Sequence, residues 1–311
     1  MQLSLLLAVQ IASMVLMILA GYGVAKSGIL PADAGKALSA IVMFVLCPCL
    51  VFEAFQMDFS REKLYGLLIG LAAAILVHVL YIPLSVVVAK VTGCDNLDRA
   101  SMIYSNAGNL IVPLLSAVLG SEYVFYSSGY LAVQTLLIWV HCIRLTSSSA
   151  KIRLRRVLTN PSIIAMEVGL LFFFLPAGLP GILNNTVEKL GVCVGPMSML
   201  GIGIIMSQMN LRSVFNDKKA WLLCILRLLV FPFIFILLVW VSHVAVLFPL
   251  GGKVLIATIL AAAGPTAVSI SQLSEVYGGD SARAGRVNVM TTLLCVVTMP
   301  VMIYIYQILC L

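Results

Sequence analysis

Ser105-Asn106-Ala107-Gly108-Asn109-Leu110-Ile111-Val112-Pro113 and Ala261-Ala262-Ala263-Gly264-Pro265-Thr266 are two helix-breaking segments, each in the middle of an apolar run. Glycine tolerates non-helical backbone angles, and proline lacks an N–H and clashes with the preceding helical turn. Lipid cannot satisfy the backbone groups that a break exposes, so such a break persists only when it is buried in protein or lines a polar cavity. Two breaks in corresponding halves of a chain are typical of a transport site.

The composition indicates an integral membrane protein. Of the 311 residues, 62% are hydrophobic and 10% are charged, and the mean hydropathy is +1.12, which leaves too little polar surface for a soluble globule. The first apolar run, residues 3 to 25, has no basic segment before it and is too long for a signal peptide, so we interpret it as helix 1. Nine further runs bring the predicted number of transmembrane helices to ten, at about 37–57, 64–89, 100–119, 123–143, 161–178, 190–210, 220–247, 254–275 and 287–309.

The basic residues predict the orientation. The loop after helix 5 contains five basic residues and no acidic one, which places it in the cytoplasm by the positive-inside rule and both termini outside the plasma membrane. Four basic residues then lie outside, at Arg61, Lys63, Lys189 and Lys253, against fourteen inside. The inside set is Lys26, Lys36, Lys90, Arg99, Arg144, Lys151, Arg153, Arg155, Arg156, Arg212, Lys218, Lys219, Arg283 and Arg286. The net charge of +7 therefore reflects topology, and nucleic acid is not an expected partner.

The same loop separates two sets of five helices. Because five is odd, the second set crosses the membrane in the opposite sense to the first. Gln56-Met57-Asp58 and Gln208-Met209-Asn210 end helices 2 and 7 at an offset of 152 residues, and the two breaks are 156 residues apart at Gly108 and Gly264. We therefore expect an inverted repeat, with five helices in 1–145, a basic cytoplasmic linker at 146–160 and five helices in 161–311.

The breaks predict a binding site for an anion. A half-helix that begins at a break presents free N–H groups and a positive dipole end, which suit a carboxylate. Neither break contains Asp, Glu, Lys or Arg, whereas cation exchangers usually place a carboxylate at such a position. The candidate substrate-binding residues are Asn106, Gly108, Asn109, Pro113, Gly264, Pro265, Thr266 and Ser269.

Two charged residues inside predicted spans are candidates for coupling or structural roles. Glu53 follows Pro48 by about one turn in helix 2, and Arg227 lies in helix 8. Intramembrane charge is costly enough for a functional role to be considered at both positions. A GxxxG spacing at Gly66 and Gly70 permits close helix packing, either within the chain or in a homodimer.

Several motifs together resemble the auxin efflux carrier, or PIN-like, family along the whole chain. The segment Asn106 to Leu114 resembles the family's Asn-x-Gly-x-x-Gly-x-Pro-Leu motif. Pro265-Thr266-Ala267-Val268, Tyr277-Gly278-Gly279-Asp280 and Arg227-Leu228-Leu229-Val230-Phe231-Pro232 resemble further family segments. The chain departs from the pattern at Ile111, where Gly is common, and at Ser269, where Asn is common. It also resembles compact bacterial members, since it has no long hydrophilic loop.

The resemblance implies ten helices in two inverted repeats, similar to bacterial sodium–proton antiporters and bile-acid symporters, with broken helices 4 and 9 crossing. It implies a scaffold domain of helices 1, 2, 6 and 7 and a transport domain of helices 3–5 and 8–10. Bacterial relatives are associated with malate and malonate, and plant relatives with indole-3-acetate. The expected function is thus secondary transport of small organic anions by an elevator mechanism.

Two alternatives stay open. Unwound carbonyl groups can bind Na⁺ without a charged side chain, as in a sodium-coupled bile-acid-like symporter. A transporter-like sensor, whose ligand is detected by a partner, is the second alternative. No enzyme activity, cofactor or metal is expected, because the motifs group no nucleophile, base and acid and the cysteines have no metal-ligand spacing.

Overall fold

The computed structural model describes residues 2–31, 33–146, 155, 158–175, 178–209, 214–248, 250–277 and 279–311. These residues fold as helices without a β-strand. The helices of the first half are α1 (Gln2–Lys26), α2 (Ala34–Ile41), α3 (Cys47–Ala54), α4 (Arg61–Thr92), α5 (Asn96–Ile103), α6 (Val112–Leu119), α7 (Ser121–Leu137) and α8 (Ile143–Thr146). Those of the second half are α10 (Pro161–Phe174), α11 (Gly181–Val192), α12 (Val194–Ser207), α14 (Lys218–Ile225), α15 (Phe231–Ser242), α16 (Val244–Leu247), α17 (Gly251–Ala262), α18 (Val268–Tyr277) and α19 (Ser281–Cys310). Four π-helical segments run directly into the helices that follow them: η1 (Val42–Leu46), η2 (Ala107–Ile111), η3 (Ile138–Cys142) and η4 (Leu226–Val230).

Several helices are suited to a membrane. By length and composition, seven stretches of the described residues could cross one: Val9–Lys26, Ala34–Ala54, Arg61–Thr92, Ser121–Thr146, Gly181–Ser207, Lys218–Ser242 and Ser281–Cys310. Shorter apolar helices occupy Ala107–Leu119, Pro161–Phe174 and Gly251–Ala262. The all-helical architecture is confirmed and is consistent with a polytopic membrane protein, whereas ten spans and an inverted repeat stay predictions.

Some of the expected features fall outside the described residues. Most of the basic linker at 146–160 does so, together with the basic residues Lys151, Arg153, Arg156 and Arg212. Asn210 and Gly278, which belong to two of the sequence motifs, also lie outside them.

The helix boundaries follow from local capping. The Ser60 hydroxyl accepts a hydrogen bond from the Lys63 N–H at 3.1 Å, which satisfies one of the free donors at the start of α4. α4 ends at Gly93, whose φ of 70° lies in the left-handed region that glycine adopts without strain. α10 begins at Pro161, just after the Asn160 side chain, which accepts from the Ser162 N–H at 3.0 Å.

Proline explains three of the four π-helical segments. η1, η2 and η4 each lead into a helix whose second residue is proline, namely Pro48, Pro113 and Pro232. A proline ring clashes with the carbonyl four residues earlier and offers no N–H to it, so the preceding turn widens. η3 has no such proline. The wide turns thus place a backbone irregularity in each of four different helical stretches.

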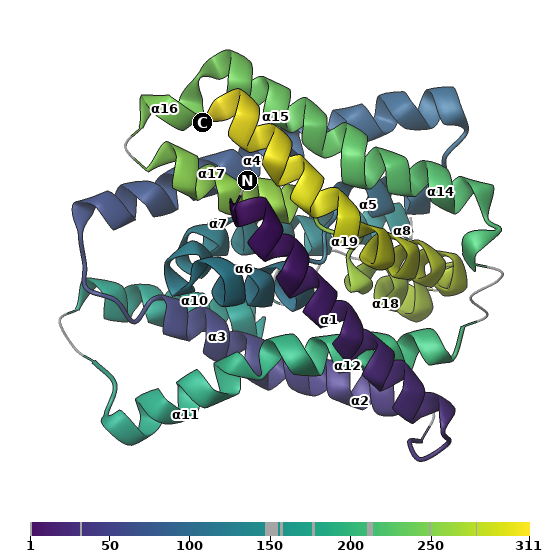
Figure 1. Cartoon of the computed structure of the whole chain (residues 1–311), viewed down its shortest axis with the longest axis horizontal. Coiled ribbons are helices and arrows are strands. Elements are labelled where there is room, and N and C mark those ends of the chain that lie inside the picture. The colour runs from purple at the N-terminus through teal and green to yellow at the C-terminus, as the bar shows by residue number, and fades with distance from the viewer. Residues whose placement is uncertain are drawn as a thin grey trace.

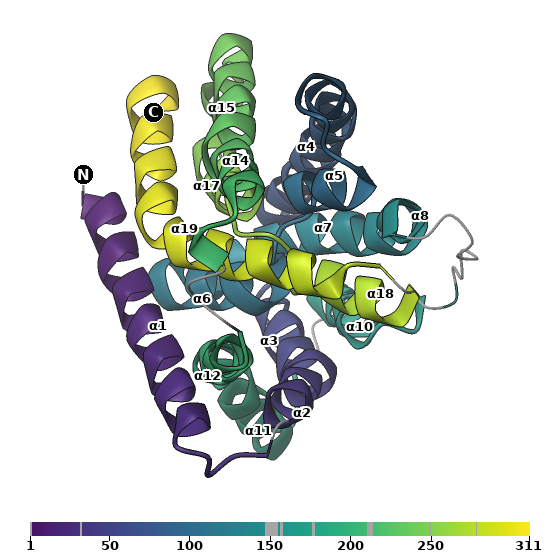
Figure 2. The same cartoon turned by 90° about the vertical axis from the view of Figure 1, so that its right-hand side faces the viewer.

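One bundle of helices consists of α1, α2, α3, α10, α11 and α12. α1 packs along α12, and α3 packs against α10 and α11. Close backbone approach explains the first contact, because a Cβ at Gly21 would overlap the backbone of Leu200, and one at Gly203 would overlap the backbone of Ile18. Figure 2 shows α1, α2, α3, α11 and α12 together on one side of the molecule. We call this group the first bundle.

The remaining helices, α4 to α8 and α14 to α19, form the second bundle. α4 packs along α7, and α17 packs against both. A Cβ at Gly70 would lie 2.5 Å from the Tyr126 carbonyl oxygen, and one at Gly129 would lie 2.9 Å from the Leu71 Cα. Gly66 also faces Tyr126, so the GxxxG pair serves packing inside the chain. The Gly66 and Gly70 pair therefore gives no support to a homodimer, which stays a prediction.

The two bundles meet in Figures 1 and 2 where α1 crosses α19 and α6 and where α3 lies against α7.

A network of ion pairs, which we call the ionic cluster, joins three helix starts of the second bundle. The Asp98 carboxylate pairs with Lys219 at 2.5 Å, Asp95 pairs with Arg283 at 2.5 Å, and Asp217 pairs with Arg286 at 3.5 Å. The starts of α5, α14 and α19 are thereby held together.

Candidate functional site

The two sequence breaks cross each other inside the second bundle. α5 ends at Ile103 and η2 begins at Ala107, while α17 ends at Ala262 and α18 begins at Val268. The intervening backbones pair in an antiparallel sense: the Asn106 N–H donates to the Pro265 carbonyl at 2.7 Å, and the Ala267 N–H donates to the Tyr104 carbonyl at 3.0 Å. Each break therefore satisfies backbone groups of the other, as a break in an apolar environment requires.

A glutamine on α7 completes the hydrogen bonding of the first break. The Gln134 Oε1 accepts from the Ser105 N–H at 3.0 Å and from its hydroxyl at 2.9 Å. Its Nε2 donates to the Ser105 carbonyl at 2.9 Å. One carboxamide thus satisfies both backbone groups and the side chain of Ser105, which fixes the break to α7.

Side chains of α19 and a backbone carbonyl of α5 complete the hydrogen bonding of the second break. The Thr266 N–H donates to the Thr291 hydroxyl at 3.1 Å, and the Thr266 carbonyl accepts from the Asn288 amide. The Thr266 hydroxyl donates to the Ser101 carbonyl of α5 at 3.0 Å. Thr266 is fully buried, so its bonds lock the crossing rather than face a ligand.

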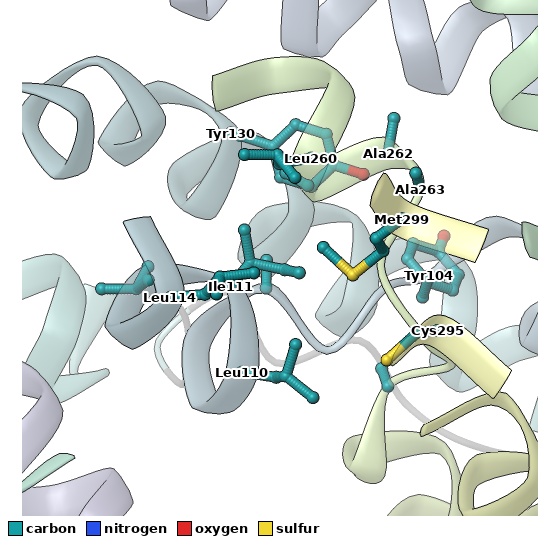
Figure 3. Packing of buried hydrophobic residues seen from close by; sticks show 14 of the residues in the cluster. Tyr104, Leu110, Ile111, Leu114, Tyr130, Leu260, Ala262, Ala263, Cys295 and Met299 are labelled. Atoms are coloured by element: carbon teal, nitrogen blue, oxygen red, sulfur yellow. The ribbon is translucent and has the colours of Figure 1, made fainter. Parts of the chain in front are cut away.

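Apolar side chains from three parts of the chain surround the crossing. Figure 3 shows Leu110 and Ile111 beside the first break, Ala262 and Ala263 at the end of α17, and Cys295 and Met299 from α19. All six are buried. A low-dielectric environment of this kind strengthens the hydrogen bonds and dipoles of the exposed backbone groups.

A cavity of about 110 Å³ lies between the crossing and the first bundle. Four of the predicted substrate-binding residues line it: Asn106, Gly108, Asn109 and Ser269. Pro113, Gly264, Pro265 and Thr266 are not among its lining residues and instead shape the crossing. Ser105 of the first break also lines the cavity, together with four polar residues that the sequence did not single out: Gln134, Thr135, Asn160 and Ser162.

The first bundle contributes a wall of the cavity through η1 and α3. Met43, Cys47 and Val51 lie on this wall. The Cys47 thiol faces the Gly108 carbonyl oxygen at 3.8 Å and the Asn109 Oδ1 at 3.9 Å. Asn109 also lines a second, smaller cavity of about 20 Å³ with Ser198 of α12. The two bundles therefore meet directly at the cavity.

Asn106 has a free donor at the site. The residue is 4% exposed, and its Nδ2 has no hydrogen-bond partner among the described residues. A buried donor without a partner is costly unless a ligand or water binds it. Because Asn106 also lines the cavity, this amide is a ready donor to an acceptor placed there.

Helix ends add to the electrostatics of the cavity. Gly108 and Asn109 lie at the start of η2, and Ser269 lies at the start of α18, so two N-terminal helix ends adjoin the cavity. Among the described residues that line it, none is Asp, Glu, Lys or Arg. The site is thus polar, uncharged in its lining, and rich in donors.

Glu53 and Arg227 do not line the cavity. A Cβ added at Gly191 of α11 would come within 2.8 Å of the Glu53 carboxylate. Glu53 therefore faces α11 within the first bundle. Arg227 is fully buried in the second bundle, where its Nη1 donates to the Met102 carbonyl of α5 at 3.2 Å. The sequence could not place either residue, because a helix with apolar residues on all sides does not reveal which face meets which neighbour.

Comparison with known proteins gives the chain its family. The model of the family described as membrane transport protein matches residues 6–154 and 145–303. The chain belongs to this family, which is the auxin efflux carrier or PIN-like family. Its members are membrane transporters and not enzymes. The resemblance seen in the sequence motifs is therefore confirmed.

A relative of this PIN-like family member supports the same class. An uncharacterized transporter of Schizosaccharomyces pombe is 29% identical to it over 104 residues. The match covers 32% of this chain and 23% of that protein. The chain thus matches about a quarter of its relative's length, and the similarity concerns that part alone.

Proposed function

We propose that this protein is a secondary transporter of small organic anions, and that the anion's carboxylate binds in the cavity at the crossing. The observation that carries the proposal is the Asn106 Nδ2, which has no partner among the described residues and belongs to a residue that lines an uncharged cavity beside the starts of η2 and α18. Donors without a competing carboxylate suit an anion. Gly108, Asn109 and Ser269 would contact the substrate, while Pro113, Gly264, Pro265 and Thr266 would hold the backbone in place.

The size of the cavity favours a short substrate. A volume of about 110 Å³ is small beside the roughly 300 to 1,000 Å³ of pockets that hold drug-sized ligands. Malonate or malate therefore suits this conformation better than an indole carboxylate, for which the two bundles would have to separate further. We infer that mono- and dicarboxylates of three or four carbons are the first candidates.

We further propose an elevator mechanism in which the first bundle is the scaffold and the second bundle is the moving domain. This assignment corresponds to helices 1, 2, 6 and 7 as scaffold and helices 3–5 and 8–10 as transport domain. It is supported by the cavity, which has one wall from η1 and α3 and another from the crossing. Movement of the second bundle would carry the substrate, held by the crossing, past the fixed wall.

The proposal includes ten spans in two inverted repeats, in a plasma membrane, with both termini outside. The antiparallel pairing of Ser105 with Thr266 supports it, because two breaks of opposite direction meet there. Reporter fusions at successive loops would test the topology. A reporter at the basic linker that is active only outside the cell would overturn the orientation.

Ligand-dependent thermal stability of the purified protein tests the proposed function. A ligand that binds only the folded state raises the melting temperature with increasing concentration. We expect malonate or malate to do so in choline chloride, and the neutral analogue malonamide to do so less. Failure of all carboxylates, including indole-3-acetate, would overturn the proposal.

Two further measurements separate the alternatives. Stabilisation that requires sodium in place of choline would identify a sodium-coupled symporter, since the free carbonyls of a break can bind Na⁺. Binding without uptake or release by reconstituted vesicles would identify a ligand sensor. Transport of radiolabelled malonate without sodium supports the simpler carrier.

A further inference from the structure

The guanidinium of Arg227 is a buried positive charge without a carboxylate partner. Its side chain is fully buried in η4, and no acidic group of the described residues lies within ion-pair distance. Its Nε and Nη2 have no hydrogen-bond partner among those residues. Removing such a charge from water is costly, so its retention inside an apolar bundle calls for a compensating role.

The groups around Arg227 connect it to the crossing. Nη1 donates to the Met102 carbonyl at 3.2 Å, in the last turn of α5, and the guanidinium lies over the Tyr81 ring at 5.8 Å from its centroid. Met102 directly precedes Ile103, the last residue of α5. Two residues after Met102, the Tyr104 carbonyl accepts from the Ala267 N–H in the crossing. Arg227 therefore contacts the helix end that leads into the crossing.

The helix ends at the crossing do not by themselves select a charge. Two N-terminal ends, of η2 and α18, and two C-terminal ends, of α5 and α17, meet there. At about +0.5 for each N-terminal end and about −0.5 for each C-terminal end, the four nearly cancel. The guanidinium lies against the C-terminal end of α5. It offsets that negative end and leaves an excess of about one positive charge.

We propose that Arg227 is the positioning residue that makes the crossing selective for anions. It does not contact the substrate. It neutralises the C-terminal end of α5, so that the positive ends beside Gly108 and Ser269 dominate the potential in the cavity. This inference rests on the proposed function, because it explains how the same cavity discriminates an anion from a neutral molecule of equal size.

The test compares malonate with malonamide, which has the same shape without the charge. Binding of both to the full-length purified protein is measured for wild type, Arg227→Met, Arg227→Gln and Arg227→Lys. Gln retains a donor for the Met102 carbonyl without the charge, and Lys retains the charge. We expect the ratio of malonate affinity to malonamide affinity to fall at least tenfold in Arg227→Met and Arg227→Gln. In Arg227→Lys, the same ratio should stay within about threefold of wild type.

The outcomes are distinguishable. Neutral variants that fold and keep the wild-type ratio would overturn the inference while malonate binding upholds the proposed function. If both neutral variants fail to fold, Arg227→Lys provides the test. An unchanged ratio of malonate to malonamide affinity in Arg227→Lys supports the inference, and a tenfold lower ratio overturns it. Absence of carboxylate binding in wild type would overturn the proposed function, and the inference with it.

Discussion

Asn106 and Thr266 lie on the two facing backbone segments of the crossing and use their side chains in opposite ways. The Thr266 hydroxyl bonds the Ser101 carbonyl, and its backbone is held by α19. The Asn106 backbone is bonded to Pro265, while its Nδ2 is left without a partner among the described residues. Structure and binding are therefore separable at this site by single substitutions.

Asn106→Ala is expected to weaken malonate binding at least tenfold and to leave the melting temperature nearly unchanged. The substitution removes a side-chain donor that makes no hydrogen bond in the structure, and it retains the backbone bond to Pro265. Titration of the ligand and thermal unfolding measure the two effects separately. Unaltered malonate affinity in a folded Asn106→Ala protein would contradict the assignment.

Gln134→Ala is the contrasting variant. It leaves the Ser105 N–H, carbonyl and hydroxyl without their α7 partners, at a cost of about 1 to 3 kcal/mol for each buried group that finds no water. We expect a clear fall in melting temperature without ligand. A melting temperature equal to that of wild type would show that the break does not depend on α7.

Gly108→Ala tests the cavity itself. A Cβ on Gly108 would meet no atom within 4 Å, and the residue lines the cavity, so the new methyl group would occupy ligand space. We expect preserved stability and weaker binding of malate than of the smaller malonate. Gly181→Ala, at an equally open position away from the cavity, is the matched control. Equal effects of the two changes would argue against the site.

At the scale of single residues, the sequence predicted the breaks but only part of the cavity. Glycine and proline reveal where a helix must stop, and the structure has a break at both of these positions. They do not reveal which side of a break faces open space. The sequence alone therefore does not separate the residues that line the cavity, such as Asn106 and Ser269, from those that do not, such as Pro113 and Thr266. Gln134 could have been recognised as an isolated carboxamide in an apolar span, which needs a partner.

At the scale of helices, hydropathy predicted most apolar runs to within a few residues, because membrane spans need a minimum apolar length. Helix 7, expected at 190–210, differs most. The helical stretch begins at Gly181, and its first part is polar and largely exposed, with a bend at Cys193. Polar residues extend this helix beyond the apolar part, so hydropathy alone could not find its start.

The ionic cluster is expected to stabilise the helices that it joins. Asp98→Ala removes a buried carboxylate that accepts from the Asp95 N–H, caps α5 with Asp95 and pairs with Lys219. We expect a loss of about 2 kcal/mol from the cap and charged hydrogen bonds, seen as a lower melting temperature. Lys90→Ala, whose side chain makes none of these bonds, is a suitable control.

The pH dependence of the cluster follows from Asp95. Burial raises the pKa of the Asp95 carboxyl, but the Asp98 N–H and the Arg283 guanidinium lower it more, so it lies below its ordinary value. A lowered pKa contributes stability above the unfolded value that is lost as the pH falls through the folded one. The difference in melting temperature between wild type and Asp95→Asn should therefore narrow below about pH 4. A constant difference would contradict a role for these charges.

At the scale of the whole molecule, an ion pair among the described residues links the two bundles. Lys36 of α2 and Glu275 of α18 approach to 2.7 Å, and both side chains are largely exposed. Exposed pairs contribute little to stability. A contact between the proposed scaffold and the proposed moving domain can nevertheless favour one conformation over another.

Lys36→Glu and Glu275→Lys are each expected to shift the balance of conformations and change the transport rate severalfold, with little effect on melting temperature. Like charges would then face each other in the present conformation, and the double swap should restore the wild-type rate. Rates measured in reconstituted vesicles provide the test. Additive effects in the double variant would mean that the pair does not act across the bundles.

The four π-helical segments have a further geometric consequence. Each residue of an α-helix advances the chain by about 100° around the axis, and a π-helical turn contains one residue more than an α turn. Removing one residue from Leu226–Val230 would therefore rotate α15 by about 100° and turn the buried Phe235 and Val239 away from the interior. The length of these five-residue windows, more than their composition, sets which face each following helix presents.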